Sequence, residues 1–175
     1  MKSEQDIKKE VLFDVAKKMI IAARTAPKGR GVDNMVFMIA ERNEIEKIGA
    51  KLIQMGEKEN LQNFIRDAKN VLLCDFIVLL GTKYQPIGLK KCGLCGYKNC
   101  EEKTKNLQAP CVFNLNDLGI AMGSAVSIAA DNRVDNRIMY TIGLAVQELG
   151  FFDSEVKVIF GIPLSATSKS PFFDR

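Results

Sequence analysis

Residues 76–82 read FIVLLGT, an apolar run of strand length without a charged residue. Because apolar and polar residues do not alternate in it, the run is typical of a strand that is covered on both faces. Such a strand needs layers on both sides of its sheet. The run therefore predicts a layered fold built around a buried strand.

The segments around this run mix helices and strands without regular β-α-β alternation, which favours an α+β fold. No GxGxxG or GxxxxGK[ST] motif is present, which argues against a Rossmann or P-loop nucleotide site. Asn116 or Asp117 is the expected N-cap of the small-residue helix that starts at residue 118. The periodicity predicts helices over 7–23, 44–55, 60–70, 118–130 and 135–149, and strands at 34–41 and 155–165.

Length and composition predict a single domain over residues 1–175, because 47% apolar residues suffice for one core. The formal net charge of +4 is too small to mark a nucleic-acid or membrane-surface protein. The N-terminal sequence MKSEQDIKKEVLFDV lacks the apolar stretch of a signal peptide, and the longest apolar run, residues 118–130, is too short to span a bilayer. We expect a cytoplasmic protein without a nucleic-acid or membrane partner.

Four of the five cysteines lie in a long irregular segment, residues 83–114, which we expect to be an inserted iron–sulfur loop. Cys92, Cys95 and Cys100 have the spacing C-x2-C-x4-C, and Cys111 is a candidate fourth ligand. Four thiolates suit a [4Fe-4S] cluster or an all-cysteine zinc site, and glycines inside the motif favour the cluster. A redox dithiol or inert thiols remain alternatives. Cys74, in an apolar run, is expected to be a core thiol.

Residues 83–105 hold six lysines against Glu101 and Glu102. A [4Fe-4S] cluster with four thiolates carries a charge of about −2, so these lysines would partly neutralise it and could attract an acidic electron-carrier protein. A solvated loop or a zinc ribbon that grips nucleic-acid phosphates would use the same lysines. Tyr97 is the only aromatic residue close enough to stack a base, which weakens the nucleic-acid alternative.

The motif CGLCGYKNC resembles the CGxCGxxxC signature of [4Fe-4S] domains in electron-transport and corrinoid iron–sulfur proteins. AARTAPKGRGVDN and GIPLSATSKSPFFDR resemble the uncharacterised ferredoxin-domain-containing proteins of the nitroreductase-like superfamily. The resemblance implies a nitroreductase-like α+β sandwich and an intertwined homodimer with FMN at its interface.

The same resemblance implies which residues would contact FMN. The loop after the first helix lies along the isoalloxazine in flavin-binding relatives, and the late basic pair meets the phosphate. Lys28 and Gly29 stand where the superfamily usually has two serines. The implied flavin contacts are Lys28, Gly29, Arg30 and Asn34, with Lys169 and Arg175 as phosphate ligands.

The sequence therefore predicts an electron-transfer protein with a [4Fe-4S] cluster. If FMN binds, the cluster passes electrons to the flavin and the protein is a flavin-dependent oxidoreductase. No histidine is available, so a proton would come from lysine, tyrosine, a carboxylate or water. Two alternatives stay open. One is a non-enzymatic iron–sulfur electron carrier or redox sensor, and the other is a zinc-stabilised interaction protein.

Overall fold

The apolar run at residues 76–82 forms strand β2 (Phe76–Lys83), which lies inside a four-stranded sheet. The computed structural model describes residues 1–106 and 108–173. The strand order is β1-β2-β4-β3, and every pair of neighbours is antiparallel. The other strands are β1 (Met35–Ala40), β3 (Asp135–Asn136) and β4 (Val156–Ser165).

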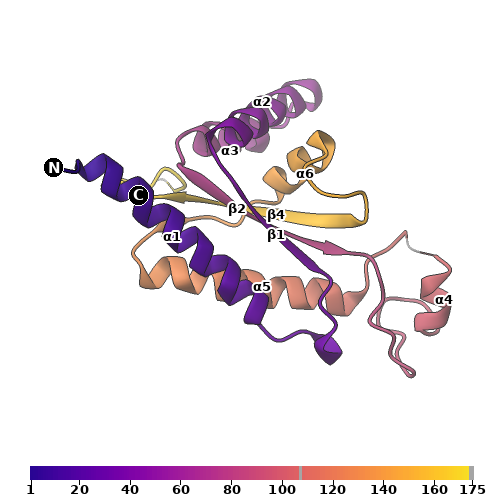
Figure 1. Ribbon diagram of the computed structural model, residues 1–175. Helices are drawn as coiled ribbons and strands as arrows, with labels where there is room; N and C mark the ends of the chain where they lie inside the picture. The colour runs from indigo at the N-terminus through magenta and orange to yellow at the C-terminus, as the bar shows by residue number, and fades with distance from the viewer. Residues whose placement is uncertain (107, 174–175) are drawn as a thin grey trace.

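Helices cover both faces of this sheet (Figure 1). On one face lie α2 (Arg42–Glu59), α3 (Gln62–Leu72) and α6 (Tyr140–Leu149). On the other face lie α1 (Glu4–Thr25) and α5 (Val112–Asp131). A short 3-10 helix, η1 (Gly29–Gly31), follows α1, and the short helix α4 (Cys100–Thr104) lies beyond the end of β2. The predicted α+β fold is confirmed.

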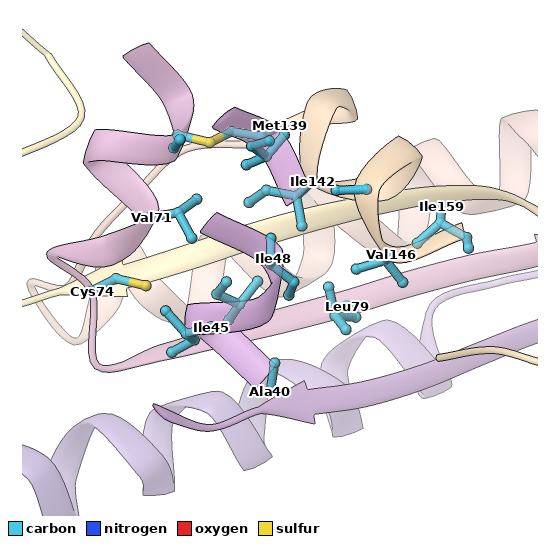
Figure 2. Close-up of a cluster of buried hydrophobic side chains, with 14 of the residues drawn as sticks. Ala40, Ile45, Ile48, Val71, Cys74, Leu79, Met139, Ile142, Val146 and Ile159 are labelled. Atoms are coloured by element: carbon cyan, nitrogen blue, oxygen red, sulfur yellow. The ribbon is translucent and has the colours of Figure 1, made fainter. Parts of the chain in front are cut away.

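β2 is buried on both faces because its side chains alternate between two cores. Ile77 and Leu79 belong to the core under α2, α3 and α6, where Figure 2 shows Leu79 among isoleucines and valines. Val78 and Leu80 belong to the core under α1 and α5. The absence of a polar face in the run is thus explained by a helical layer on each side.

Local interactions set two of the helix ends. Ser3 and Asp6 form a capping box at the start of α1. Gly150 ends α6 in the left-handed conformation, with φ of 68°. The irregular stretch between β2 and α5 covers residues 84–111 and contains α4.

Two sequence expectations about helices were wrong. α5 begins at Val112, so Asn116 and Asp117 lie inside the helix and Cys111 is its N-cap. The expected helix over 135–149 begins only at Tyr140, because Asp135 and Asn136 pair with the end of β4 as strand β3.

Among the described residues, α5 is the one helix that is long and apolar enough to cross a membrane by length and composition alone. In this fold its alanine side packs into the core: Ala121, Ala125 and Ala129 have no exposed area. The opposite side of α5 is open.

Candidate functional site

The cysteine segment, residues 84–111, leaves the end of β2 and returns to the start of α5 (Figure 1). Cys92, Cys95 and Cys100 lie in it, and all three are half-buried. The chain turns over residues 93–96, around the second cysteine, where the Gly96 amide donates to the Gly93 carbonyl at 3.1 Å. Gly96 has a φ of 87°, which other residues rarely adopt, so the glycine permits this turn.

Local capping fixes Cys100 at the first position of α4. The Asn99 side chain accepts a hydrogen bond from the Glu102 amide at 2.9 Å, which is a typical N-cap contact. The Glu102 carboxylate in turn accepts from the Lys98 amide at 2.6 Å. The third cysteine therefore stands at an ordered helix start.

Cys111 lies at the other end of the segment, as the N-cap of α5, and is only 4% exposed. Its carbonyl accepts from the Leu115 amide at 3.3 Å. The cysteine segment therefore supplies three accessible thiols and one buried thiol.

Two adjoining hollows open beside the accessible thiols. One, of about 560 Å³, is lined by Cys92 and by Lys90, Lys91 and Lys98. The other, of about 430 Å³, is lined by Cys100 and Glu101. Leu89, Lys90 and Asn99 line both, so the first and third cysteines open onto neighbouring spaces.

The donor set fits a [4Fe-4S] cluster or a tetrahedral zinc ion in number and type, because both take four thiolates. Within residues 1–106 and 108–173, however, no three cysteine or acidic side chains lie close enough together to hold a metal ion. The four ligand candidates share one segment in this structure without converging on a point.

The flavin residues implied for the first loop lie together at the end of α1. The Lys28 ammonium donates to the carbonyls of Ala23, Arg24 and Ala26, each at 2.7 Å. Desolvation lowers the pKa of Lys28 below its ordinary value, while the Asp33 carboxylate acts in the opposite direction. The Lys28 ammonium thus provides hydrogen-bond donors to the carbonyls at the C-terminal end of α1.

Gly29 and Arg30 join this loop to other parts of the chain. The Gly29 amide donates to both oxygens of the buried Asp117 carboxylate, at 3.1 and 3.0 Å. The Arg30 guanidinium donates to the carbonyls of Ile87 and Gly88, at 2.8 and 2.6 Å. The loop after α1 is therefore fastened to α5 and to the base of the cysteine segment.

Asn34 extends the same network. Its side-chain Nδ2 donates to the Gln85 carbonyl at 3.1 Å and to Oδ1 of Asn114 at 3.2 Å. Asn114, which has no exposed area, donates to the carbonyls of Lys83 and Gln85, at 2.8 and 2.7 Å. These bonds set where the chain leaves β2 and enters the cysteine segment.

Lys169 lies at the opposite end of the sheet. It lines a hollow of about 380 Å³ with Leu73 and Ser165, close to where β2 begins. The loop after α1 meets the other end of β2, where the Lys83 amide donates to the Asn34 carbonyl at 3.2 Å. Phe76 and Thr82 are six positions apart, which is roughly 20 Å of strand. Arg175 lies outside the described residues.

Cys74 is a core thiol, as predicted. It is 3% exposed and packs among isoleucines and valines under α2 and α3 (Figure 2). Burial, with a smaller contribution from Asp75, raises the pKa of Cys74 to about 12. A thiol that stays protonated is a poor metal ligand, so Cys74 is a natural control for the other four.

Sequence reasoning missed three polar residues of this region: Lys103, Asn114 and Asp117, all buried. Asn114 and Asp117 stand three residues apart on α5, and that spacing is the one local signal that both side chains share a face of the helix. Their hydrogen-bond partners are remote in sequence and could not be inferred from it.

The layered fold is that of the nitroreductases. A nitroreductase family protein from Clostridium novyi NT is 17% identical with a TM-score of 0.59, and the match covers 86% of this chain and 72% of that one. A putative nitroreductase in complex with FMN from Desulfovibrio desulfuricans is 11% identical with a TM-score of 0.61, covering 93% and 78%. The chain has a nitroreductase-like α+β fold.

A relative from Archaeoglobus fulgidus, named "Uncharacterized protein", is 42% identical over 180 residues, covering 99% of this chain and 96% of the relative. Residues 108–175 match the family model described as "Uncharacterized protein containing a ferredoxin domain (DUF2148)". The chain belongs to this family, which confirms the predicted resemblance to the uncharacterised ferredoxin-domain-containing proteins. The matched residues include Cys111, while Cys92, Cys95 and Cys100 precede them.

Proposed function

We propose that the chain is an electron-transfer protein in which Cys92, Cys95, Cys100 and Cys111 hold a [4Fe-4S] cluster. The observation that carries the proposal is the cysteine segment itself: three half-buried thiols around a glycine turn, and a fourth thiol at the start of α5. The family description and the nitroreductase-like fold both support a redox role. When bound, the cluster supplies one-electron transfer.

The lysines of the segment would serve this function by their charge. Lys90, Lys91 and Lys98 are exposed and line the hollow next to Cys92. Their ammonium groups would offset the negative charge of a thiolate-bound cluster and attract an acidic electron-carrier protein. Because these charges are exposed, association with such a partner should weaken as salt rises.

We further propose that FMN binds between two copies of the chain. Within one chain, the loop at 28–34 and Lys169 lie at opposite ends of β2, roughly 20 Å apart. This is too far for one FMN to place its ring on the loop and its phosphate on Lys169 of the same chain. Two copies packed in opposite directions would bring the loop of one beside Lys169 of the other. The loop also contacts the base of the cysteine segment through Arg30, so flavin and cluster sites would adjoin.

The cluster proposal is tested by exchanging each cysteine for serine and purifying the proteins without oxygen. Cys92→Ser, Cys95→Ser and Cys100→Ser should each lose iron and acid-labile sulfide, because serine is a poor substitute for a soft thiolate ligand. Cys111→Ser tests the buried ligand in the same way. Cys74→Ser is the matched control and should keep the iron content of the wild type.

A series in which Cys74→Ser loses as much iron as the other variants would contradict the assignment of ligands. Stoichiometric zinc without iron in the wild type would instead support the zinc-stabilised interaction protein. Iron that survives all four ligand substitutions would show that the metal binds elsewhere.

A second candidate is a non-enzymatic iron–sulfur electron carrier or redox sensor on a flavin-free nitroreductase-like fold. One observation favours it: Lys28, Gly29, Arg30 and Asn34 all donate hydrogen bonds within the chain. Titration of FMN into metal-loaded protein at low salt decides between the two. Saturable binding that weakens about ten- to a hundredfold in Lys169→Ala supports the flavin protein, and no binding supports the carrier.

A further inference from the structure

Lys103 is a fully buried lysine in the cysteine segment. It stands on α4, one helical turn after Cys100, and has no exposed area. Lysines are almost never fully buried unless they are paired. By contrast, Lys90, Lys91, Lys98 and Lys105, also in this segment, are exposed. The burial of one ammonium among these lysines calls for a physical reason.

The Lys103 ammonium contacts three parts of the segment. Its Nζ donates to the Asn106 carbonyl at 3.0 Å. The same atom lies 5.2 Å from the ring centroid of Tyr97 and 6.0 Å from that of Tyr84, distances at which a cation is attracted to a ring face. Tyr84 follows β2 directly, and Tyr97 lies between Cys95 and Cys100. Lys103 therefore connects the base of the segment, the cysteine turn and α4.

No carboxylate neutralises this ammonium within the part of the chain that the structure describes. None of the ion pairs among residues 1–106 and 108–173 includes Lys103. Glu101 pairs with Lys105, and Glu102 accepts from the Lys98 amide. A buried charge without an opposite charge is unfavourable, and one carbonyl with two rings offsets only part of the cost.

We infer that Lys103 is a positioning residue for the cysteine ligands and the buried countercharge of the anionic group that they hold. The inference rests on the proposed function. By holding Tyr97 and α4, Lys103 places the stretch that ends at Cys100. A cluster with four thiolates carries a charge of about −2, and because the Lys103 ammonium is itself buried, it would stabilise this charge more strongly than the exposed lysines do.

The test compares Lys103→Met, Lys103→Arg and the control Lys105→Met, all purified without oxygen. Methionine keeps an unbranched chain without the charge, arginine keeps the charge, and Lys105 is the exposed C-cap residue of the same short helix. Lys103→Met should lose iron to a chelator about ten- to a hundredfold faster than the wild type, the range expected for residues that support metal ligands. Its midpoint potential should also be more negative than that of the wild type. The reduced cluster carries one more negative charge than the oxidised one, so the loss of the lysine charge destabilises the reduced state more. Lys105→Met should match the wild type in both.

A second readout needs no metal. In the metal-free protein, chymotrypsin should cut after Tyr97 faster in Lys103→Met than in Lys105→Met, because the ring loses its cation. Tyr97→Phe, which keeps the ring, should hold iron as the wild type does, and Tyr97→Leu should resemble Lys103→Met.

If Lys103→Met cannot be loaded with iron, Lys103→Arg decides: iron held by the arginine variant supports a charge role, and iron lost in both variants contradicts it. If the wild type holds iron, and Lys103→Met has the same midpoint potential and rate of iron loss, the inference about Lys103 is overturned while the proposed function stands. A wild type that never holds iron overturns the proposed function and the countercharge with it. Equal cleavage after Tyr97 in Lys103→Met and Lys105→Met then also removes the positioning role.

Discussion

At the scale of single residues, Lys28 holds the end of α1 through the carbonyls of Ala23, Arg24 and Ala26. Carbonyls in the last turn of a helix lack partners unless a donor reaches them. We expect Lys28→Met to lower the free energy of unfolding by about 1 kcal/mol, and Tm in a thermal scan by roughly 2–4 °C. Lys18→Met, at an exposed position of α1, is the control. Equal Tm values for the two variants would mean that Lys28 is free to serve another role, such as flavin binding.

At the scale of elements, α6 lies directly on the backbone of β4 at Gly143. A Cβ atom at this position would overlap the carbonyl oxygen of Ile159. Because a strand backbone in mid-sheet cannot move aside, Gly143→Ala should lower the free energy of unfolding by about 3 kcal/mol and Tm by roughly 10 °C. Gln147→Ala, on the exposed side of α6, should leave Tm unchanged. A Gly143→Ala protein as stable as this control would show that α6 lies farther from β4.

At the scale of the whole molecule, the open side of α5 is where we expect a second copy to pack. A Cβ atom at Gly119 or Gly123 would meet nothing within 4 Å, and Leu115 and Ile120 on this helix are 39% and 38% exposed. Gly123→Leu therefore has room within one chain and should act only on a dimer, which it should dissociate in light scattering. Ala50→Leu, exposed on α2, is the control. A wild type that is monomeric at high concentration would contradict the dimer.

The sequence was sufficient to predict elements whose pattern is local. FIVLLGT has no polar face, which is how β2 was recognised as a strand with a layer on each side. The start of α5 could not be predicted in this way. Asp117 looks like a capping residue, but its carboxylate accepts from the remote Gly29 amide, and Asn114, inside the same helix, donates to the remote Gln85 carbonyl. The two residues of β3 were assigned to a helix because their pairing with β4 is equally non-local.

The same division holds for the candidate site. The spacing of Cys92, Cys95 and Cys100 identifies a ligand set because the motif is confined to one short segment. The burial of Lys103 could not be foreseen, since its ring partner Tyr84 lies 19 positions earlier and a lysine-rich segment suggests exposure. The internal hydrogen bonds of Arg30 and Asn34 depend on the path of residues 85–88, which the sequence does not specify.

The cluster is the central claim, and the most direct measurement is the metal content of the wild-type protein prepared entirely without oxygen. Iron, acid-labile sulfide and zinc are quantified against protein, and the absorption spectrum is followed on reduction with dithionite. We predict about four irons and about four sulfides per chain, little zinc, and a brown colour that bleaches on reduction. One zinc per chain without iron or sulfide would contradict the account.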